Sequence, residues 1–206
     1  HCPNPFLIAF GDSKTGDIGS SPMVVGEWVP ALAEAVRTGG HWVGFTSEAR
    51  GKGGETLGGA AARVVAYLAT IPVSPAPMYV WLNWGANEMV WAGLPAEATW
   101  RGYYTTILDA IHAKWPDAQC YLTRPWAQGQ DADADTLAGW IATVVSDRST
   151  FAHLGDDERV WLKGADDGAT NTSDGVHYST AGQTAATTAK AAVLGYRCEP
   201  PSTGAS

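Results

Sequence analysis

The stretch Phe-Leu-Ile-Ala-Phe-Gly-Asp-Ser, residues 6–13, joins a short apolar run directly to a polar turn. An unbroken apolar run that ends at a glycine is typical of a strand buried on both faces. In an open parallel sheet, ligands bind beyond the carboxyl ends of the strands, where Ser13 would lie. This stretch therefore predicts the first strand of a parallel sheet and its functional edge.

Short runs of this kind alternate with longer helical patterns along the chain. We predict strands at Phe6–Phe10, His41–Phe45, Met78–Trp84, Gln119–Thr123 and Val160–Leu162. We predict helices at Gly26–Thr38, Leu57–Thr70, Ala96–Lys114, Ala134–Ser149 and Thr180–Tyr196. This order is typical of a parallel sheet with crossover helices on both faces. The sequence therefore predicts an α/β fold with an open, doubly wound, five-stranded parallel sheet.

Length and composition fit one folded domain. The 206 residues are enough for one sizeable core, and we expect a single domain over 1–199 with a flexible tail over 200–206. The formal net charge is -8 and the basic residues are scattered singly, which argues against nucleic-acid binding. The longest apolar runs are too short to span a bilayer, so we expect no membrane segment.

The three cysteines predict a disulfide and a compartment. Cys2, Cys120 and Cys198 lack the C-x-x-C spacing of a zinc or redox site. In a doubly wound fold the first strand starts and the last helix ends opposite the functional edge, so we expect a Cys2–Cys198 disulfide. Cys120, inside a strand, is the competing partner but fits a buried free thiol. The disulfide, and the lack of a leader before His1, favour a secreted or cell-surface protein, as a mature chain or an excised domain.

Peptide mapping under non-reducing conditions tests this pairing. We expect a crosslinked peptide that joins Cys2 to Cys198 and a free thiol at Cys120. Closing so long a loop stabilises a fold by about 4 to 5 kcal/mol in the chain-entropy model, so reduction should lower the melting temperature. A crosslink that includes Cys120, or three free thiols in oxidised protein, would contradict the pairing and its support for secretion.

Ser13 is a candidate nucleophile because it follows the first strand. A serine hydroxyl needs a general base within hydrogen-bond reach and a third group that orients the base. Of the five histidines, His177 stands apart, in a loop before the last helix and three residues after Asp174. A turn at Gly175 would let that carboxylate bind one ring nitrogen while the other faces the serine.

Ester hydrolysis also needs donors for the negative charge that develops on the carbonyl oxygen. Asn87 offers a side-chain amide after the third predicted strand, and Gly54 a backbone N–H after the second. The alternatives are a helix cap at Asn87 and a turn with positive φ at Gly54.

The proposed nucleophile and base have structural interpretations too. Asp12 or Ser13 would cap a helix, or Asp174 or Ser179 would cap the last helix and leave His177 exposed in a loop. The joint occurrence of all these groups after strands one, two, three and five favours catalysis, because those strand ends share one edge of the sheet.

This order of residues resembles the SGNH hydrolases, also called the GDSL-type esterases. The resemblance extends to about Gly195 and rests on Gly11-Asp12-Ser13, Gly54-Glu55-Thr56, Gly85-Ala86-Asn87-Glu88 and Asp174-Gly175-Val176-His177. It implies a flavodoxin-like, three-layer α/β/α fold and serine ester hydrolysis without a metal or another cofactor. It makes Ser13 the nucleophile, His177 the base and acid, and Asp174 the orienting group. It forms the oxyanion hole from the backbone N–H groups of Ser13 and Gly54 and the side chain of Asn87.

Two positions depart from the family pattern. Lys14 replaces the leucine of Gly-Asp-Ser-Leu, and Glu88 replaces the aspartate that often follows the third-block asparagine. Neither position has one of the named catalytic roles, so the expected activity is unaffected. The assignment of Gly54 has four competitors nearby, namely Gly51, Gly53, Gly58 and Gly59.

Aromatic and acidic residues near the expected edge suggest ligand contacts. Trp84, Trp91 and Trp126 fall in or near its loops, where indole rings suit a sugar or an acyl donor, although indoles are also ordinary core residues. The acids of Asp131-Ala-Asp133-Ala-Asp135 alternate as in a calcium loop, but the glycine and the bidentate glutamate of that loop are missing. We expect them to favour the N-terminus of the following helix instead.

We therefore expect a serine carboxylic ester hydrolase that acts on short acyl esters, such as acetyl groups on carbohydrates. The expected partner is a small ester or an acylated carbohydrate, and the sequence does not predict an oligomeric state. The same triad would serve an acyltransferase if an alcohol outcompetes water. The alternatives from other classes are a non-catalytic carbohydrate-binding module and a phosphate binder built on Gly11–Gly19.

Overall fold

Five parallel strands form the centre of the protein. The computed structural model describes residues 6–18, 24–38, 45–164 and 166–195. The sheet has the order β4-β1-β5-β6-β7 and is parallel throughout. Its strands are β1 (Phe6–Gly11), β4 (Thr46–Gly51), β5 (Tyr79–Asn83), β6 (Gln119–Arg124) and β7 (Ala152–Asp157). Counted within this sheet, the order is 2-1-3-4-5, which is that of flavodoxin. A short antiparallel pair, β2 (Gly16–Asp17) and β3 (Val24–Val25), stands beside it.

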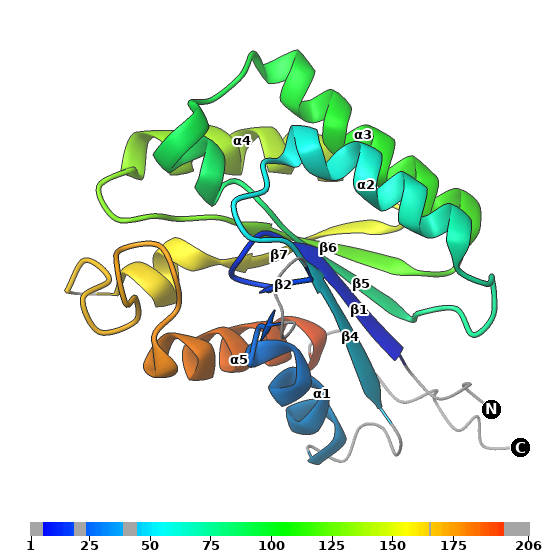
Figure 1. Cartoon of the computed structure of the whole chain (residues 1–206), viewed down its shortest axis with the longest axis horizontal. Coiled ribbons are helices and arrows are strands. Elements are labelled where there is room, and N and C mark those ends of the chain that lie inside the picture. Colours follow the sequence, from blue (N-terminus) through cyan, green and yellow to red (C-terminus); the bar gives the residue numbers. More distant parts are fainter. Residues whose placement is uncertain (1–5, 19–23, 39–44, 165, 196–206) are drawn as a thin grey trace, which may run out of the picture.

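Helices cover both faces of the sheet, so the predicted three-layer α/β/α fold is confirmed. Figure 1 shows α2, α3 and α4 on one face and α1 and α5 on the other. Their bounds are α1 (Trp28–Thr38), α2 (Leu57–Thr70), α3 (Glu97–Lys114), α4 (Asp131–Asp147) and α5 (Thr180–Gly195). Two π-helical turns, η1 (Glu88–Ala92) and η2 (Arg159–Lys163), follow the third and fifth strands of the sheet.

Two of the predicted strands differ from the structure. The strand expected at His41–Phe45 has Phe45 outside any strand and residues 41–44 outside the described ranges, and the observed strand β4 starts at Thr46, directly after the predicted end. The strand expected at Val160–Leu162 is part of η2, and β7 precedes it. Both true strands are at the edges of the sheet, where a partly exposed strand tolerates polar residues such as the paired Glu48 and Arg50. The apolar runs at His41–Phe45 and Val160–Leu162 therefore resembled buried strands more closely than the true edge strands did.

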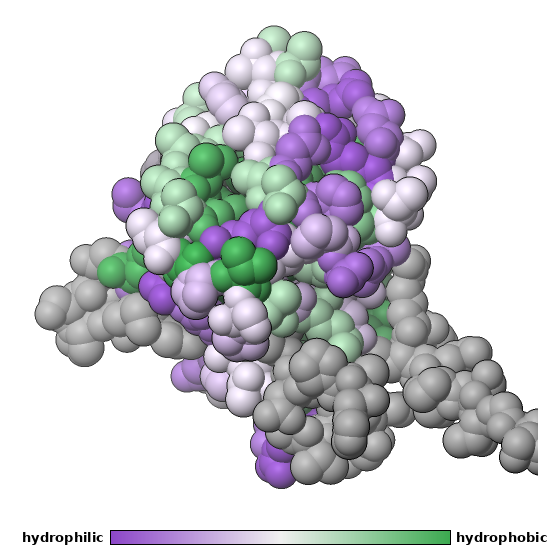
Figure 2. Space-filling model, turned by 90° about the vertical axis from the view of Figure 1, so that its right-hand side faces the viewer, coloured by the Kyte–Doolittle hydropathy of each residue, from purple (hydrophilic) through white to green (hydrophobic). Residues whose placement is uncertain are grey.

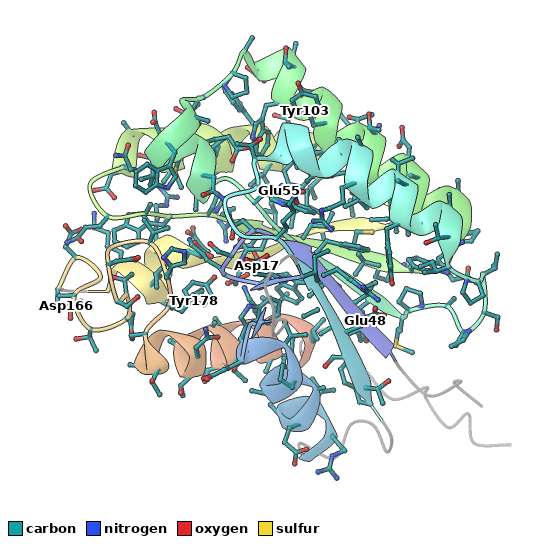
Figure 3. All side chains as sticks on the ribbon, in the orientation of Figure 1. Asp17, Glu48, Glu55, Tyr103, Asp166 and Tyr178 are labelled. Carbon is teal, nitrogen blue, oxygen red and sulfur yellow. The ribbon has the colours of Figure 1, made fainter. Side chains whose placement is uncertain are left out.

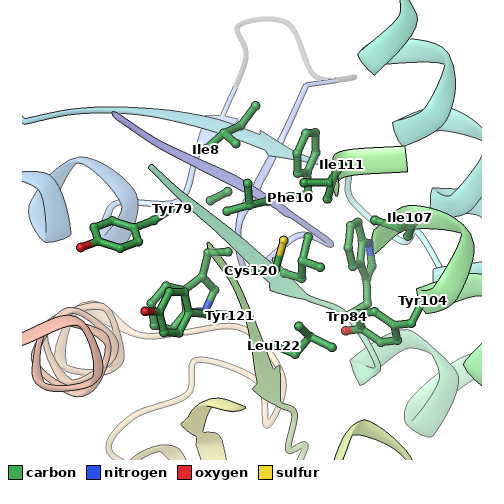
Figure 4. Close-up of a cluster of buried hydrophobic side chains, with 14 of the residues drawn as sticks. Ile8, Phe10, Tyr79, Trp84, Tyr104, Ile107, Ile111, Cys120, Tyr121 and Leu122 are labelled. Atoms are coloured by element: carbon green, nitrogen blue, oxygen red, sulfur yellow. The ribbon is translucent and has the colours of Figure 1, made fainter. Parts of the chain in front are cut away.

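The central strands are buried because helices cover them and neighbouring strands flank them. Figure 4 shows side chains of β1, β5 and β6 packed with residues of α3. Trp84 and Tyr104 meet there edge to face, with ring centroids 6.3 Å apart. Cys120 is a buried free thiol, as predicted, and burial raises the pKa of that thiol. Cys2 and Cys198 lie outside the described residues, so their disulfide stays a prediction.

The surface where the strands begin is of mixed polarity. Figure 2 shows hydrophobic residues interspersed with hydrophilic ones on this face, which is opposite the carboxyl ends of the strands. In the part of the chain that the structure describes, no helix is long and apolar enough to cross a membrane.

Candidate active site

The helices that follow the neighbouring strands β1 and β5 cover opposite faces of the sheet, so the carboxyl ends of these two strands mark its switch point. α1 follows β1 and covers one face of the sheet, whereas α3 follows β5 and covers the other. The crevice between two such strands is the ligand site of doubly wound folds. Ser13 follows β1 and Asn87 follows β5, so the two candidate residues lie on the two sides of this crevice.

The turn that carries Ser13 is held by its own backbone and by Asp12. The carbonyl oxygen of Asp12 accepts the N–H groups of Thr15 at 3.0 Å and Gly16 at 3.3 Å, and its Oδ1 accepts the N–H of Lys14 at 3.0 Å. The chain then enters β2, so the alternative that Asp12 or Ser13 caps a helix here is wrong. The result is a tight turn in which Ser13 remains partly accessible.

Asp12 serves this turn and is not placed to meet a substrate. It is 1% exposed, and burial raises the pKa of its carboxyl group to about 7, an effect that Lys14 partly offsets. One carboxylate oxygen holds the Lys14 N–H and the other has no partner among the described residues. Asp12 is therefore no rival for the role of general base.

The structure brings Ser13, His177 and Asp174 together in one hydrogen-bonded chain. Ser13 Oγ lies 2.9 Å from His177 Nε2, and His177 Nδ1 lies 2.7 Å from Asp174 Oδ2. Since the carboxylate accepts the proton of Nδ1, Nε2 is the free acceptor for the serine hydroxyl. This is the arrangement that activates a serine as a nucleophile.

Asp174 also shapes the loop in which it lies. Its Oδ1 accepts the N–H groups of Val176 at 3.0 Å and His177 at 2.8 Å, so its side chain closes the turn through Gly175. Gly175 has φ +83°, a left-handed conformation that favours glycine. Asp174 therefore does not cap α5, contrary to that alternative; the hydroxyl of Ser179 does, accepting the N–H of Gly182 at 3.1 Å.

The hydrogen bonds around Asp174 lower the pKa of its carboxyl group. Its partial burial favours the neutral form, but the hydrogen bonds from the His177 backbone and ring and from the Val176 N–H outweigh this. Together they hold the pKa of Asp174 below its ordinary value. The carboxylate can therefore orient the imidazole across the pH range in which a histidine changes charge.

Asn87 and Gly54 are brought to neighbouring positions. Asn87 Nδ2 donates to the carbonyl oxygen of Glu55 at 2.9 Å, next to Gly54. Asn87 makes no side-chain cap to η1, so the capping alternative is wrong. One N–H of its amide makes this bond, and the other has no acceptor among the described residues, so it is available as a donor.

Gly54 combines both of its sequence interpretations. It adopts a turn conformation with φ +68°, and open space surrounds the position that a Cβ would take. Of its competitors, Gly51 ends β4 and Gly58 and Gly59 lie in α2, which leaves Gly53 in the same loop. Within the described residues, the backbone N–H groups of Ser13 and Gly54 donate to no protein acceptor. Both are therefore available as donors.

Glu88, the second departure from the family pattern, has a structural role. Its buried carboxylate accepts the N–H of Leu57, the first residue of α2, at 2.5 Å. Burial raises the pKa of Glu88, and the hydrogen bond from Leu57 opposes this. Glu88 thus ties η1 to α2 beside the loop that carries Gly54.

The expectation of substrate contacts from Trp84 and Trp126 is wrong. Both indoles are fully buried, Trp84 against Tyr104 and Trp126 against Gly168, so neither presents a face to a ligand. Trp91 is different: it lies in η1, one turn after Asn87, and is 78% exposed.

The alternating acids belong to the start of a helix, as expected. α4 begins at Asp131, and Asp131 and Asp133 lie in its first turn. The Asp131 carboxylate accepts hydrogen bonds from Trp126 Nε1 at 2.8 Å and Lys163 Nζ at 2.6 Å. Among the described residues, no group of three metal-ligating side chains comes together.

Sequence reasoning did not single out Glu158 and Tyr178. Both are buried beneath the site, and Figure 3 shows Tyr178, Asp17 and Glu55 around the carboxyl ends of the strands. The signals available were the charged Lys14 in the family motif and the position of Tyr178 next to His177.

Comparison with known proteins gives the family and the fold of this chain. The model of the GDSL-like lipase/acylhydrolase family matches residues 9–185. Among solved structures, a lipase/acylhydrolase from Enterococcus faecalis has a TM-score of 0.73 at 17% identity, covering 95% of this chain and 98% of its own. A comparison with curated proteins finds no match.

Two further solved structures are esterases. A mutant of an acetyl esterase, solved with an acetate ion, has a TM-score of 0.71 at 15% identity. A carbohydrate esterase family 3 protein from Talaromyces cellulolyticus has a TM-score of 0.71 at 17% identity. Each match covers 94% of this chain and 98% of the other. At these identities the likeness shows the shared fold.

Proposed function

The chain belongs to the GDSL-like lipase/acylhydrolase family, and from this premise we propose that it is a serine carboxylic ester hydrolase that works through an acyl-enzyme. One observation carries the proposal: the hydrogen-bonded chain from Ser13 Oγ through His177 to Asp174 at the functional edge of the sheet. A binding module has no use for a base placed 2.9 Å from a serine hydroxyl.

In the proposed mechanism Ser13 Oγ attacks the ester carbonyl while His177 Nε2 takes the hydroxyl proton. Asp174 stabilises the imidazolium that forms. His177 then gives this proton to the departing alcohol, which leaves an acylated Ser13. Water attacks the acyl group, again with His177 as the base, and release of the acid restores the hydroxyl.

Three donors would stabilise the oxyanion of each tetrahedral intermediate: the backbone N–H groups of Ser13 and Gly54 and the free N–H of the Asn87 amide. The first two lack a protein acceptor within the described ranges, and the third is fixed by the bond to Glu55. Donors that are held in place before the reaction need no reorganisation as charge develops, which is why such sites contribute strongly to catalysis.

For the substrate we propose short acyl esters, such as acetyl groups on carbohydrates. The solved structures of similar fold include an acetyl esterase and a carbohydrate esterase. The exposed ring of Trp91, in the element that begins beside Asn87, would stack on a sugar ring.

Hydrolysis of p-nitrophenyl acetate, of longer acyl esters and of acetylated polysaccharides tests this proposal. We expect turnover of acetyl esters that falls as the acyl chain lengthens. Trp91→Ala should raise the KM for an acetylated polysaccharide and leave the KM for p-nitrophenyl acetate unchanged. Absence of turnover on every ester would overturn the proposed function, whereas a preference for long chains would overturn the substrate class alone.

We predict that kcat/KM rises with pH and then levels off, because His177 acts as a base only after it loses its proton. Asp174, whose pKa is lowered, stays ionised across this rise and does not add a second ionisation. In Asp174→Asn no carboxylate accepts the Nδ1 proton or stabilises the imidazolium, so the plateau should fall. A kcat/KM that stays constant or falls as the pH rises would contradict the role of His177 as the base. A separate test of the metal-free mechanism is the addition of EDTA: loss of activity that a divalent ion restores would contradict it.

A further inference from the structure

A fully buried ion pair lies directly beneath the candidate site. Lys14 Nζ lies 2.6 Å from Glu158 Oε2, and both side chains have 0% exposure. Lys14 Nζ also donates to the carbonyl oxygen of Trp126 at 2.8 Å. Withdrawing two charges from water opposes folding and offsets much of their attraction, so a buried pair is weak grounds for a stabilising role. The role of the Lys14–Glu158 pair is therefore sought in the groups that it contacts.

Glu158 gathers donors from four separate segments. Besides Lys14, its carboxylate accepts the N–H of Trp126 at 2.8 Å, the side-chain amide of Asn83 at 3.4 Å and the hydroxyl of Tyr178. Asn83 is the last residue of β5 and Trp126 follows β6, while Glu158 itself follows β7. One carboxylate thus links the carboxyl ends of neighbouring strands.

Tyr178 is a donor in this network. Burial raises the pKa of its phenol well above the ordinary value, and the charges of Glu158 and Asp156 raise it further. The hydroxyl therefore keeps its proton, donates it to Glu158 and accepts the Asn83 amide at 3.2 Å. The Lys14 ammonium also lies 5.5 Å from the centre of the Tyr178 ring.

The two ends of the network adjoin the two reacting groups. Lys14 follows Ser13 in the chain, and Tyr178 follows His177. Tyr178 also pairs with Thr172 across the base of the loop that presents the imidazole. The His177 side chain is 49% exposed, so little packing from above fixes its position. Asp174 holds the ring from within the same loop, and the Glu158 network lies below that loop and joins it to the turn of Ser13.

We propose that Lys14, Glu158 and Tyr178 are positioning residues that hold the Ser13 hydroxyl and the His177 imidazole in register for catalysis. The role in catalysis rests on the proposed ester hydrolysis. A displacement of about 1 Å between reacting groups can cost a hundredfold in rate, so such a device is worth the burial of two charges. It also explains why Lys14 stands where the family motif has leucine.

The protein contains a matched control for this network. Lys190 Nζ lies 2.7 Å from Asp156 Oδ2, and these side chains are 0% and 1% exposed. Asp156 also accepts hydrogen bonds from Thr123 at 2.6 Å and Trp161 at 2.9 Å. This second buried pair therefore has a similar chemistry, and its side-chain hydrogen bonds go to neither Lys14, Glu158 nor Tyr178. Its contact with the network is the packing of the Trp161 ring against Tyr178, 5.2 Å between ring centroids, and the substitutions at Lys190 and Asp156 leave both rings in place.

The test compares two double variants and two single ones. Lys14→Met with Glu158→Leu removes the network, and Lys190→Met with Asp156→Leu removes the control pair. Tyr178→Phe removes one hydroxyl group from the network. Tyr104→Phe removes the hydroxyl group of another buried tyrosine, which lies in α3 and outside the network. For each we would measure the melting temperature, kcat and KM on p-nitrophenyl acetate, and the rate at which a fluorophosphonate labels Ser13, all well below the lowest melting temperature.

We expect kcat to fall only when the network is altered, whichever way each double substitution moves the melting temperature. The fall should be about a hundredfold in the Lys14/Glu158 variant and about tenfold in Tyr178→Phe, with KM within about twofold and labelling slowed in proportion. The loss of a merely structural network would shift the melting temperature and leave kcat per folded molecule unchanged. That outcome, or an equal loss of kcat in the control pair, overturns the proposal. If the double variant does not fold, the comparison of the two tyrosine variants decides.

A readout without turnover separates this proposal from the proposed function. In NMR spectra of histidine-labelled protein, the Nδ1 proton that His177 shares with Asp174 should be sharp in the wild type and in the control variants. It should broaden in Tyr178→Phe, because the imidazole is no longer held in one position. A wild type that hydrolyses no ester would overturn the proposed function, and an unchanged proton signal in Tyr178→Phe would overturn the positioning role.

Discussion

Ser13→Ala is expected to abolish ester turnover while the protein stays folded. The hydroxyl forms the covalent bond of the proposed acyl-enzyme, and neither His177 nor the oxyanion donors can replace it. Losing the nucleophile of a catalytic triad lowers kcat by about 10⁴-fold or more. Ser13 is partly exposed and its hydroxyl bonds to His177 alone among the described residues, so its removal should leave the melting temperature nearly unchanged.

Steady-state assays with p-nitrophenyl acetate measure this loss, with Ser173→Ala as the control. Ser173 lies in the loop of His177, and its exposed hydroxyl makes one long hydrogen bond of 3.4 Å to the His177 carbonyl, so kcat should stay within about twofold. A fluorophosphonate should label Ser13 in the wild type and nothing in Ser13→Ala. If Ser13→Ala kept a tenth or more of the wild-type kcat, or if the label fell on another residue, Ser13 would not be the nucleophile.

The sequence predicts the central strands well and the edge strands badly, for one physical reason. β1, β5 and β6 are buried on both faces, which requires near-continuous apolar runs that can be read directly from residues such as Leu7–Phe10. The helices are also predicted well: the helical patterns place all five of them within three residues of their observed bounds. β4 and β7 have one neighbouring strand each, so their sequences carry charged residues and no clear alternation.

The catalytic candidates could be found because their chemistry is local. Asp174, Gly175 and His177 form a turn within four residues, and Ser13 follows a readable strand, so spacing alone predicts their arrangement. The exposure of a tryptophan depends instead on what packs against it. Trp126 is enclosed by Gly168, 42 residues later in the chain, and no local pattern indicates this.

The buried network could not be predicted for the same reason. Lys14 and Glu158 are 144 residues apart, and a charged residue in a loop is usually solvated. Only the folded chain shows that the lysine turns inward to meet a carboxylate at the end of an edge strand that sequence analysis had missed. Glu158 follows directly after β7, so without that strand its place at the carboxyl edge of the sheet could not be predicted.

Asn87→Ala is expected to lower kcat by about a hundredfold or more with a smaller change in KM. The amide is 5% exposed and is fixed by its bond to the Glu55 carbonyl, so its second N–H is held in place before a substrate arrives. An oxyanion accepts such a hydrogen bond more strongly than the neutral carbonyl of the bound ester does. The loss should therefore appear in kcat, measured on p-nitrophenyl acetate, and in kcat/KM by a similar factor.

Asn171→Ala provides the control, because Asn171 is a partly buried asparagine whose amide also donates to a backbone carbonyl, that of Trp161, at 2.6 Å. Both variants lose a hydrogen bond of this kind, and both should melt at lower temperature, but kcat should fall in Asn87→Ala alone. Asn87→Asp separates the donor from the shape of the side chain: a carboxylate repels the developing oxyanion, so its kcat should be at least as low as that of alanine. If KM rose in Asn87→Ala while kcat held, Asn87 would bind substrate and transition state equally, and its place in the oxyanion hole would be wrong.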